Sequence, residues 1–222
     1  MKPIRILLVP TCLVLLAVAG CSDNSPTQPT DPDGPPPRTW NVPAEVATIA
    51  AAADSAQQGD IIVVAPGVYL EHGIVLDIGV DLRGSSGKSA DVVIDGQGLG
   101  RVLAVQQHDG TEPTPNDTVS VIADLVLTGG NSGGGGGLLL EHAAAVTNVR
   151  FVGNTSAGLG GGVLVGAGAP VTFTHCAFDT NSTTVVGGNG GGLALDGSGR
   201  SALFDSCDFS GNTSLGHGGG LW

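Results

Sequence analysis

Four aspartates in the C-terminal part of the chain have the side-chain type that acid–base chemistry requires. They are Asp179, Asp196, Asp205 and Asp208. Hydrolysis of a glycosidic bond needs two carboxyl groups roughly 5 to 10 Å apart, one as an acid and the other as a base or nucleophile. These aspartates offer several pairs, but no local motif selects one of them, so they assign no catalytic residue.

A second chemistry would combine carboxylates with a base. Carboxylates would hold calcium against an acidic sugar, and an arginine or lysine would take a proton from the sugar. Arg150 is the candidate base, and Asp205 and Asp208 are candidate carboxylates on a nearby outer face. Charged side chains on a surface are usually only solvated, and no motif surrounds these three residues.

The histidines give no better candidate for a site. His108, His142, His175 and His217 show no spacing that is typical of metal ligands, and isolated histidines are more often surface residues. We therefore predict no catalytic residue, no metal ligand and no cofactor. Calcium is expected only if the chain removes a proton from an acidic sugar as described above, which is the chemistry of a polysaccharide lyase.

A repeated sequence motif indicates the fold that would position these candidate residues. Phe-x-x-Asn occurs at Phe151–Asn154, Phe178–Asn181 and Phe209–Asn212, with offsets of 27 and 31 residues. Each copy is followed by three glycines and two apolar residues. A motif that recurs at a period of this length indicates a solenoid, in which each repeat forms one coil.

Within each repeat the apolar residues alternate with a period of two, which indicates strands with one buried face. Ala144 and Val146 alternate first, and after a slip of one residue Val149 and Phe151 alternate. The slip predicts a bend between two short strands, and the glycine run predicts a corner before a third strand. Thr183, outside these positions, is expected to face outward. The fold class is therefore all-β, a parallel β-helix.

Equivalent side chains of neighbouring coils should stack, because paired strands lie about 4.8 Å apart. Asn154, Asn181 and Asn212 are expected to form a ladder at a corner where Asn tolerates left-handed backbone. Phe151, Phe178 and Phe209 are the corresponding stack inside the coil. The ladder also explains why these asparagines begin Asn-x-Ser/Thr triplets, which otherwise match glycosylation acceptors.

Two cysteines share one position of the repeat. Cys176 and Cys207 are 31 residues apart, which is the coil offset, and Val149 fills the same position one coil earlier. The strand spacing does not exclude a disulfide bond, although pairs in register on parallel strands are awkward for it. Buried thiols are the favoured interpretation.

The alternation of Phe-x-x-Asn with Gly-Gly-apolar resembles the repeats of chlamydial polymorphic outer-membrane proteins. The segment Gly59–Tyr69, with Asp60 and Pro66-Gly67, also resembles the first coil of right-handed parallel β-helices of the pectin-lyase-like superfamily. The resemblance covers roughly residues 40–222. It implies a right-handed β-helix, and it implies either an adhesive surface protein or a polysaccharide lyase.

The N-terminal residues resemble a bacterial lipoprotein signal. Lys2 and Arg5 precede an apolar stretch that is too short to span a membrane, and Leu16–Cys21 resembles a lipoprotein cleavage box. Residues 1–20 are thus expected to be a signal peptide, and the resemblance implies lipidation of Cys21. With Ser22 after the cysteine, we expect an outer-membrane lipoprotein that faces the periplasm or the exterior.

The remaining boundaries follow from composition. Residues 21–39 are rich in proline and poor in apolar residues, which predicts an extended linker. Residues 40–222 are predicted to be the β-helix domain, and we expect the longer protein to continue after Trp222. A helix over Ala50–Gln58, with Thr48 as its N-cap and Gly59 as its stop, is expected to cover the first coil.

Net charge excludes one class of partner. The chain has a formal net charge of −12 with 20 acidic and eight basic residues, and loss of residues 1–20 would remove two of the bases. Nucleic-acid binding requires a basic face. The expected partners are therefore the membrane through the lipid anchor and a polysaccharide or cell surface. The expected function is a surface scaffold or adhesin, with a polysaccharide lyase as the alternative.

Overall fold

The computed structural model describes residues 36–107, 119–166, 170–197 and 201–222. Pro37–Trp222 form one compact unit, separate from Met1–Pro36. The predicted signal peptide lies outside the described residues, and so does most of the predicted linker. The account below concerns the compact unit alone.

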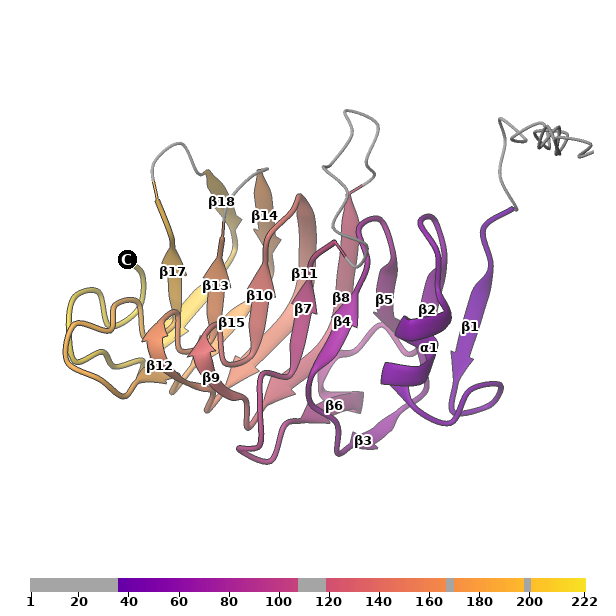
Figure 1. The fold of residues 1–222 in the computed structure, drawn as a ribbon, viewed down its shortest axis with the longest axis horizontal. Helices are drawn as coiled ribbons and strands as arrows, with labels where there is room; N and C mark the ends of the chain where they lie inside the picture. The colour runs from indigo at the N-terminus through magenta and orange to yellow at the C-terminus, as the bar shows by residue number, and fades with distance from the viewer. Residues whose placement is uncertain (1–35, 108–118, 167–169, 198–200) are drawn as a thin grey trace, which may run out of the picture. The chain divides into compact units, whose positions relative to one another are not determined.

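The described strands form three sheets in which all pairs are parallel (Figure 1). The first sheet, sheet A, contains β1 (Thr39–Val42), β2 (Ile61–Val64), β5 (Asp81–Gly84), β8 (Ser120–Thr128), β11 (Ala144–Val152), β14 (Val171–Thr174) and β18 (Ala202–Asp205). The same sheet includes β3 (Gly67–Tyr69), β6 (Val92–Asp95), β15 (Ala177–Asp179) and β19 (Asp208–Ser210).

Sheets B and C complete each coil. Sheet B contains β4 (Ile74–Leu76), β7 (Leu103–Val105), β10 (Leu138–Leu140), β13 (Val163–Val165) and β17 (Leu193–Leu195). Sheet C contains β9 (Asn131–Gly134), β12 (Thr155–Leu159) and β16 (Ser182–Thr183). In Figure 1 the strands of sheet B run upward in front of sheet A, and successive coils advance from right to left, which makes the β-helix right-handed. The predicted fold class is confirmed.

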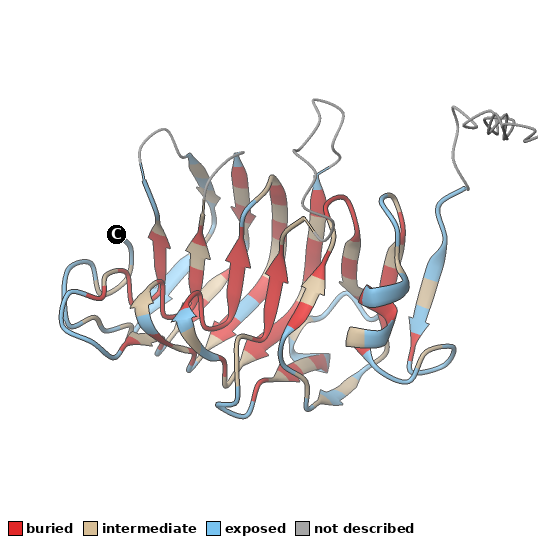
Figure 2. Cartoon of the chain, viewed as in Figure 1, coloured by how far each residue is buried: buried red, intermediate tan, exposed pale blue. Residues whose placement is uncertain are grey.

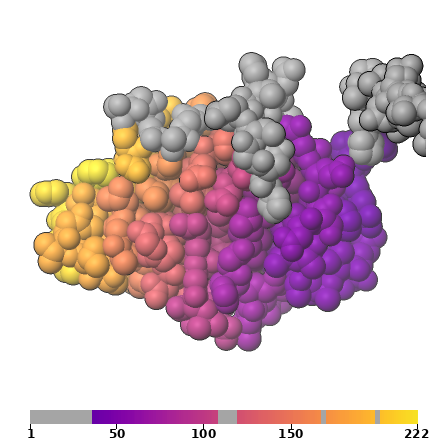
Figure 3. Space-filling view, in the orientation of Figure 1, coloured from indigo at the N-terminus to yellow at the C-terminus, as the bar shows by residue number. Residues whose placement is uncertain are grey.

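The core is the interior of the coils (Figure 2). Several strands bury alternate residues, as in β11, where Ala144, Val146, Val149 and Phe151 are at most 1% exposed. The shift between Val146 and Val149 is the predicted bend, and the residue that makes it is Asn148, whose φ is 53°. Figure 3 shows the coils as successive bands of colour across the surface.

Glycines line the corner that leads into sheet B because this corner leaves no room for side chains. Gly160 has a φ of 63°, a backbone conformation that favours glycine. A Cβ atom on Gly161 would collide with the backbone oxygens of Gly191 and Ser182 in the next coil. The glycine triplets of the repeat therefore allow neighbouring coils to stack closely.

Helix α1 (Ile49–Ser55) covers the first coil and packs against β4, β2 and β1. Thr48 is its N-cap, as predicted, because the backbone N–H of Ala51 donates to the Thr48 hydroxyl at 3.2 Å. The predicted C-terminal end was wrong. The helix ends at Ser55 rather than Gln58, because Ala56 already has extended backbone, with a ψ of 146°.

Two further contacts hold this end of the β-helix. The Glu71 carboxylate accepts hydrogen bonds from the N–H groups of Ile49 (3.0 Å) and Ala50 (2.9 Å), which have no partner within the helix. Trp40 lies in register with the buried Ile62, and its indole N–H donates to Asp60 at 2.9 Å. These contacts join the cap to the first coil.

Candidate functional site

The three ladder asparagines lie in one continuous row of hydrogen bonds. The side-chain oxygen of Asn181 accepts from both the backbone N–H and the carboxamide of Asn154, each at 3.0 Å. The side-chain oxygen of Asn212 accepts in the same way from Asn181, at 2.9 and 3.0 Å. Asn154 and Asn181 are fully buried. Each carboxamide therefore connects neighbouring coils.

The reason that we expected for asparagine at this corner was wrong. The left-handed residues are Gly153, Thr180 and Gly211, each directly before a ladder asparagine, with φ between 54° and 62°. The asparagines themselves do not have positive φ. Asparagine is required here because its carboxamide both donates and accepts, and not because it tolerates left-handed backbone.

The aromatic residues form two parallel stacks inside the coils. Phe151 and Phe178 have ring centroids 4.9 Å apart, and Phe178 and Phe209 have centroids 4.4 Å apart. Phe173 and Phe204 form the second stack at 5.3 Å. The two stacks meet edge to face, with 5.6 Å between Phe173 and Phe178. Phe209, in the last described coil, is 36% exposed.

A hydroxyl row beside the ladder was missed by the sequence reasoning. The register aligns Ser132 with Ser156 and Ser156 with Thr183. Each hydroxyl donates to a carbonyl oxygen a few residues later, as Ser156 does to Leu159 at 3.1 Å and Thr183 to Gly188 at 2.9 Å. Thr183 is 3% exposed, so the prediction that it faces outward was wrong.

The signal for this row was present in the Asn-x-Ser/Thr triplets. The asparagine of each triplet belongs to the ladder, and the hydroxyl residue two positions later belongs to the hydroxyl row. Because side chains alternate along a strand, residues i and i+2 share a face. The burial of Asn154 and Asn181 also shows that these triplets are structural in the folded chain.

The ladder ends at Asn154 on the N-terminal side. In the preceding coil Gly130 occupies the equivalent position, and its N–H donates to the Asn154 side-chain oxygen at 2.8 Å. Asn131, one residue later, is exposed and aligned with Thr155. Leu125 and Leu127 lie opposite Val149 and Phe151, as the repeat predicts.

Cys176 and Cys207 are both free thiols. The Cys176 thiol is buried and donates to the carbonyl oxygen of Val146 at 3.4 Å. Burial raises the pKa of Cys176 to about 12. Cys207 is half-buried.

The bend of sheet A presents a row of polar side chains to solvent. The left-handed residues of four successive coils are Asp124, Asn148, His175 and Ser206, with φ between 53° and 62°. The Asn148 carboxamide donates to Asp124 at 2.7 Å, and the Ser206 hydroxyl donates to Asp205 at 2.9 Å. Polar groups therefore follow one another at the strand spacing along this bend.

Outward residues on either side of the bend extend this row to a polar face. Thr147, Thr174 and Asp205 are in register on one side of it. On the other side Arg150 forms an ion pair with Asp179 at 3.2 Å. We use the name polar face for Thr147, Asn148, Arg150, Thr174, His175, Asp179, Asp205, Ser206 and Asp208. All nine are half-buried or exposed.

The polar face contains Arg150, Asp205 and Asp208, the residues that the sequence proposed for lyase chemistry. The Arg150 guanidinium forms an ion pair with Asp179. Among the described residues no group of three or more His, Cys, Asp or Glu side chains is placed to hold a metal ion.

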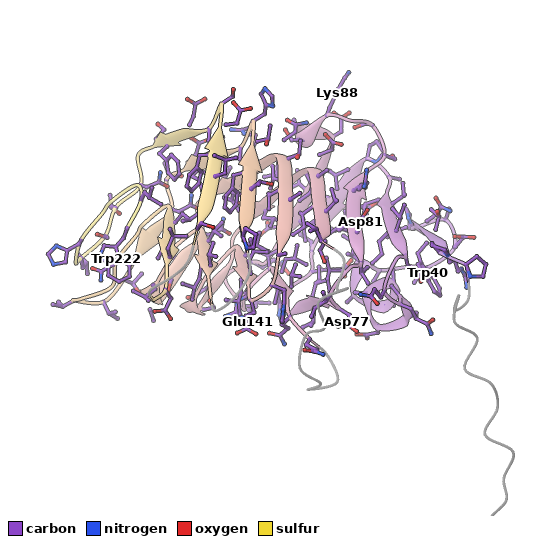
Figure 4. All side chains as sticks on the ribbon, turned by 90° about the horizontal axis from the view of Figure 1, so that it is seen from above. Trp40, Asp77, Asp81, Lys88, Glu141 and Trp222 are labelled. Atoms are coloured by element: carbon purple, nitrogen blue, oxygen red, sulfur yellow. The ribbon has the colours of Figure 1, made fainter. Side chains whose placement is uncertain are left out.

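The outer face of sheet B carries no acid or base on its central row. Val75, Ala104, Leu139, Leu164 and Ala194 form this row, in register from coil to coil, and Ala104, Leu139 and Ala194 are at most 8% exposed. Acidic residues follow the strand ends instead, and Figure 4 shows two of them, Asp77 and Glu141, on the side opposite Lys88.

Arg101 has a structural role beside sheet B. Its guanidinium donates to the carbonyl oxygens of Gly134 at 2.8 Å and Gly135 at 3.1 Å. Burial lowers the pKa of Arg101, and Glu141 partly opposes this shift. The arginine thus satisfies carbonyl groups of the glycine corner.

Two predictions fall outside the described residues. Cys21, the expected lipid anchor, belongs to the part of the chain that the structure does not describe, and so does His108. Within the described ranges no helix has the length and apolar character needed to cross a bilayer. The anchor and the envelope location stay predictions.

Comparison with known proteins gave no relative. No family model matches the chain, and no curated protein and no solved structure matches it.

Proposed function

We propose that this protein is a lipid-anchored scaffold or adhesin of the cell envelope, whose polar face binds a glycan or another surface. The observation that carries the proposal is the register of the polar face. Thr147, Thr174 and Asp205 repeat at the strand spacing of about 4.8 Å across three coils. A row of hydrogen-bonding groups at fixed spacing suits an extended polymer.

The chemistry of the face supports a polar ligand. It combines hydroxyls, a carboxamide, an imidazole, a guanidinium and carboxylates, and these groups donate and accept hydrogen bonds with sugar hydroxyls. The ladders beneath the face hold its strands in position, so that little ordering is needed on binding. Preorganisation of this kind favours affinity.

A binding measurement tests the proposal. The purified protein is applied to immobilised neutral, acidic and amino-sugar polysaccharides, with and without calcium. We expect saturable binding to at least one polymer, weakened at least about tenfold, or 1.4 kcal/mol, in the variant Arg150→Ala/Thr174→Ala/Asp208→Ala. The matched control is Asp196→Ala, at an exposed residue that follows sheet B.

Two outcomes contradict the proposal. Absence of binding to every polymer removes the glycan part of it, and equal binding by the polar-face variant and the wild type places the site elsewhere. A calcium-dependent rise in ultraviolet absorbance from an unsaturated sugar product would instead establish the alternative, a polysaccharide lyase.

A further inference from the structure

Cys176 and Cys207 occupy equivalent positions of neighbouring coils. Ala177 pairs with Asp208 in the register of β15 and β19, and the N–H of Asp208 donates to the carbonyl oxygen of Cys176 at 2.9 Å. Neighbouring strands are about 4.8 Å apart, within the Cα separation of about 4.4 to 6.8 Å that disulfides span. The backbone already brings the two residues to a distance that a disulfide can bridge.

The thiols also point in the same direction. Each donates to a carbonyl oxygen of the preceding coil, Cys176 to Val146 and Cys207 to Phe173, both at 3.4 Å. The Cys207 thiol also interacts with the Cys176 thiol, and this interaction, like burial, raises the pKa of Cys176. The two sulfur atoms are therefore neighbours, and no other residue separates them along the stack.

One adjustment is needed to join the sulfur atoms. Stacked side chains on parallel strands keep Cβ atoms close to the strand spacing, whereas a disulfide prefers a Cβ separation of about 3.5 to 4.5 Å. The strand spacing of about 4.8 Å exceeds the upper end of this range by only about 0.3 Å.

We propose that Cys176 and Cys207 form a disulfide bond that fastens the last described coil to the coil before it, in an oxidising compartment. The oxidant is a disulfide of a small molecule or of an exchange protein. Secreted and envelope proteins meet such oxidants, whereas cytosolic proteins do not. The inference stands apart from the proposed ligand, and only its occurrence in the cell depends on the envelope location.

The accessible thiol reacts first. The half-buried Cys207 thiolate attacks one sulfur of the oxidant, whose S–S bond breaks, and one half leaves as a thiolate that takes up a proton. The Cys176 thiolate then attacks the Cys207 sulfur and expels the second half as a thiol. In total, two S–H bonds of the protein are replaced by one S–S bond, and one molecule of oxidant is reduced to two thiols.

Peptide mapping under non-reducing conditions tests the proposal, because the positions of the basic residues separate the cysteines. Trypsin cleaves after Arg150 and Arg200, so Cys176 lies on residues 151–200 and Cys207 on residues 201–222, while Cys12 and Cys21 lie on another peptide. After treatment of the native protein with oxidised glutathione, we expect these two peptides as one species, two hydrogen masses lighter than their sum.

Two variants serve as controls. Cys207→Ser should abolish the linked species, since it removes the accessible thiol. Cys176→Val, which copies Val149 at the same position of an earlier coil, should preserve the fold and leave a stable glutathione adduct on Cys207. Because Cys176 has a pKa of about 12, closure from the mixed disulfide should accelerate roughly tenfold per pH unit between pH 7 and 9.

A persistent glutathione adduct on Cys207 of the wild-type protein at pH 9, with Cys176 still a thiol, would overturn the proposal. Linkage only after addition of denaturant would overturn it as well, because the bond would then belong to the unfolded chain. If the bond forms in the native state, the oxidised protein should melt roughly 5 °C or more above the reduced protein.

Discussion

At the scale of single residues, the carboxamide of Asn181 forms hydrogen bonds with three other residues. It accepts from Asn154 twice and donates to the carbonyl oxygen of Phe151 and to Asn212. An unmade hydrogen bond at a buried group costs about 1 to 3 kcal/mol. The ladder therefore tolerates few other side chains, and aspartate, which has the same shape, is the sharpest probe of it.

We expect Asn181→Asp to lower the free energy of unfolding at neutral pH by roughly 3 kcal/mol or more. A carboxylate cannot donate to Phe151 or Asn212, and its charge would lie in a fully buried position. Urea unfolding followed by circular dichroism measures the change. The matched control is Val186→Asp, which places the same charge on a residue that is 91% exposed. Equal loss of stability in both variants would refute the role of the ladder.

The orientation of Thr183 was predicted wrongly from the sequence. Its position in the alternation was read as outward, but the hydroxyl is buried, donates to Gly188 and accepts from the N–H of Leu215. The alternation that starts from Asn181 would have placed Thr183 on the inner face. The partners of its hydroxyl come from the loop after it and from the next coil, which the sequence does not identify.

At the scale of elements, the N-terminal cap depends on Asp60. This carboxylate is 7% exposed and accepts hydrogen bonds from the indole of Trp40 and from the N–H groups of Arg38 and Gln57, at 2.7 to 3.0 Å. Burial by itself raises the pKa of Asp60, but the hydrogen bonds from Trp40, Arg38 and Gln57 outweigh it, so that the pKa lies below its ordinary value. The folded state thus prefers the ionised carboxylate.

The depressed pKa of Asp60 predicts a dependence of stability on pH. The carboxylate contributes stability above its unfolded pKa, near 3.8, and this contribution is lost as pH falls through the lower folded pKa. We expect Asp60→Asn to be less stable than the wild type at pH 7, and the difference to shrink below about pH 4. Thermal unfolding from pH 7 to pH 2 measures it.

The surface carboxylate Asp91 supplies the control for this prediction. Asp91→Asn changes the same group at an exposed position in the short helix Ser89–Asp91, away from the cap. The Asp91→Asn variant should leave the pH dependence of thermal stability close to that of the wild type. A constant difference between Asp60→Asn and the wild type at every pH would show that the ionised form has no special role.

At the scale of the compact unit, the three sides of the β-helix have different chemistry. The polar face lies on sheet A, and the central row of sheet B is apolar. In sheet C the hydroxyl row is largely buried, and the alternate row, Asn131, Thr155 and Ser182, is polar as well. Trp40 and Trp222 lie at opposite ends of the unit (Figure 4). The polar face can present its side chains to a partner in a fixed direction, which is the basis of the proposed function.

The lipid anchor belongs to the scale of the whole chain. We expect Cys21→Ser to move the protein from the membrane fraction to the soluble fraction of the cell, because the sulfur that would carry the lipid is lost. Immunoblotting of the fractions measures this. Cys12→Ser, within the predicted signal segment, is the matched control and should stay with the membrane. Retention of Cys21→Ser on the membrane would argue against lipidation.

The sequence by itself determined the fold class, the coil offset and the residues that stack. Phe151, Phe178 and Phe209 recur at the coil offset, and parallel strands place equivalent residues above one another at a fixed distance. Once the repeat is recognised, the core of the coils and the asparagine ladder follow without knowledge of the loops.

Only the tertiary structure decided which residues the corners and loops bring together. Thr180 rather than Asn181 takes the left-handed conformation, Glu71 reaches the N-terminus of helix α1, and Arg101 donates to Gly134 and Gly135. These contacts join residues whose separation in the sequence follows no fixed period. They depend on the path of irregular segments, which local alternation does not encode, and that is why they could not be predicted from the pattern alone.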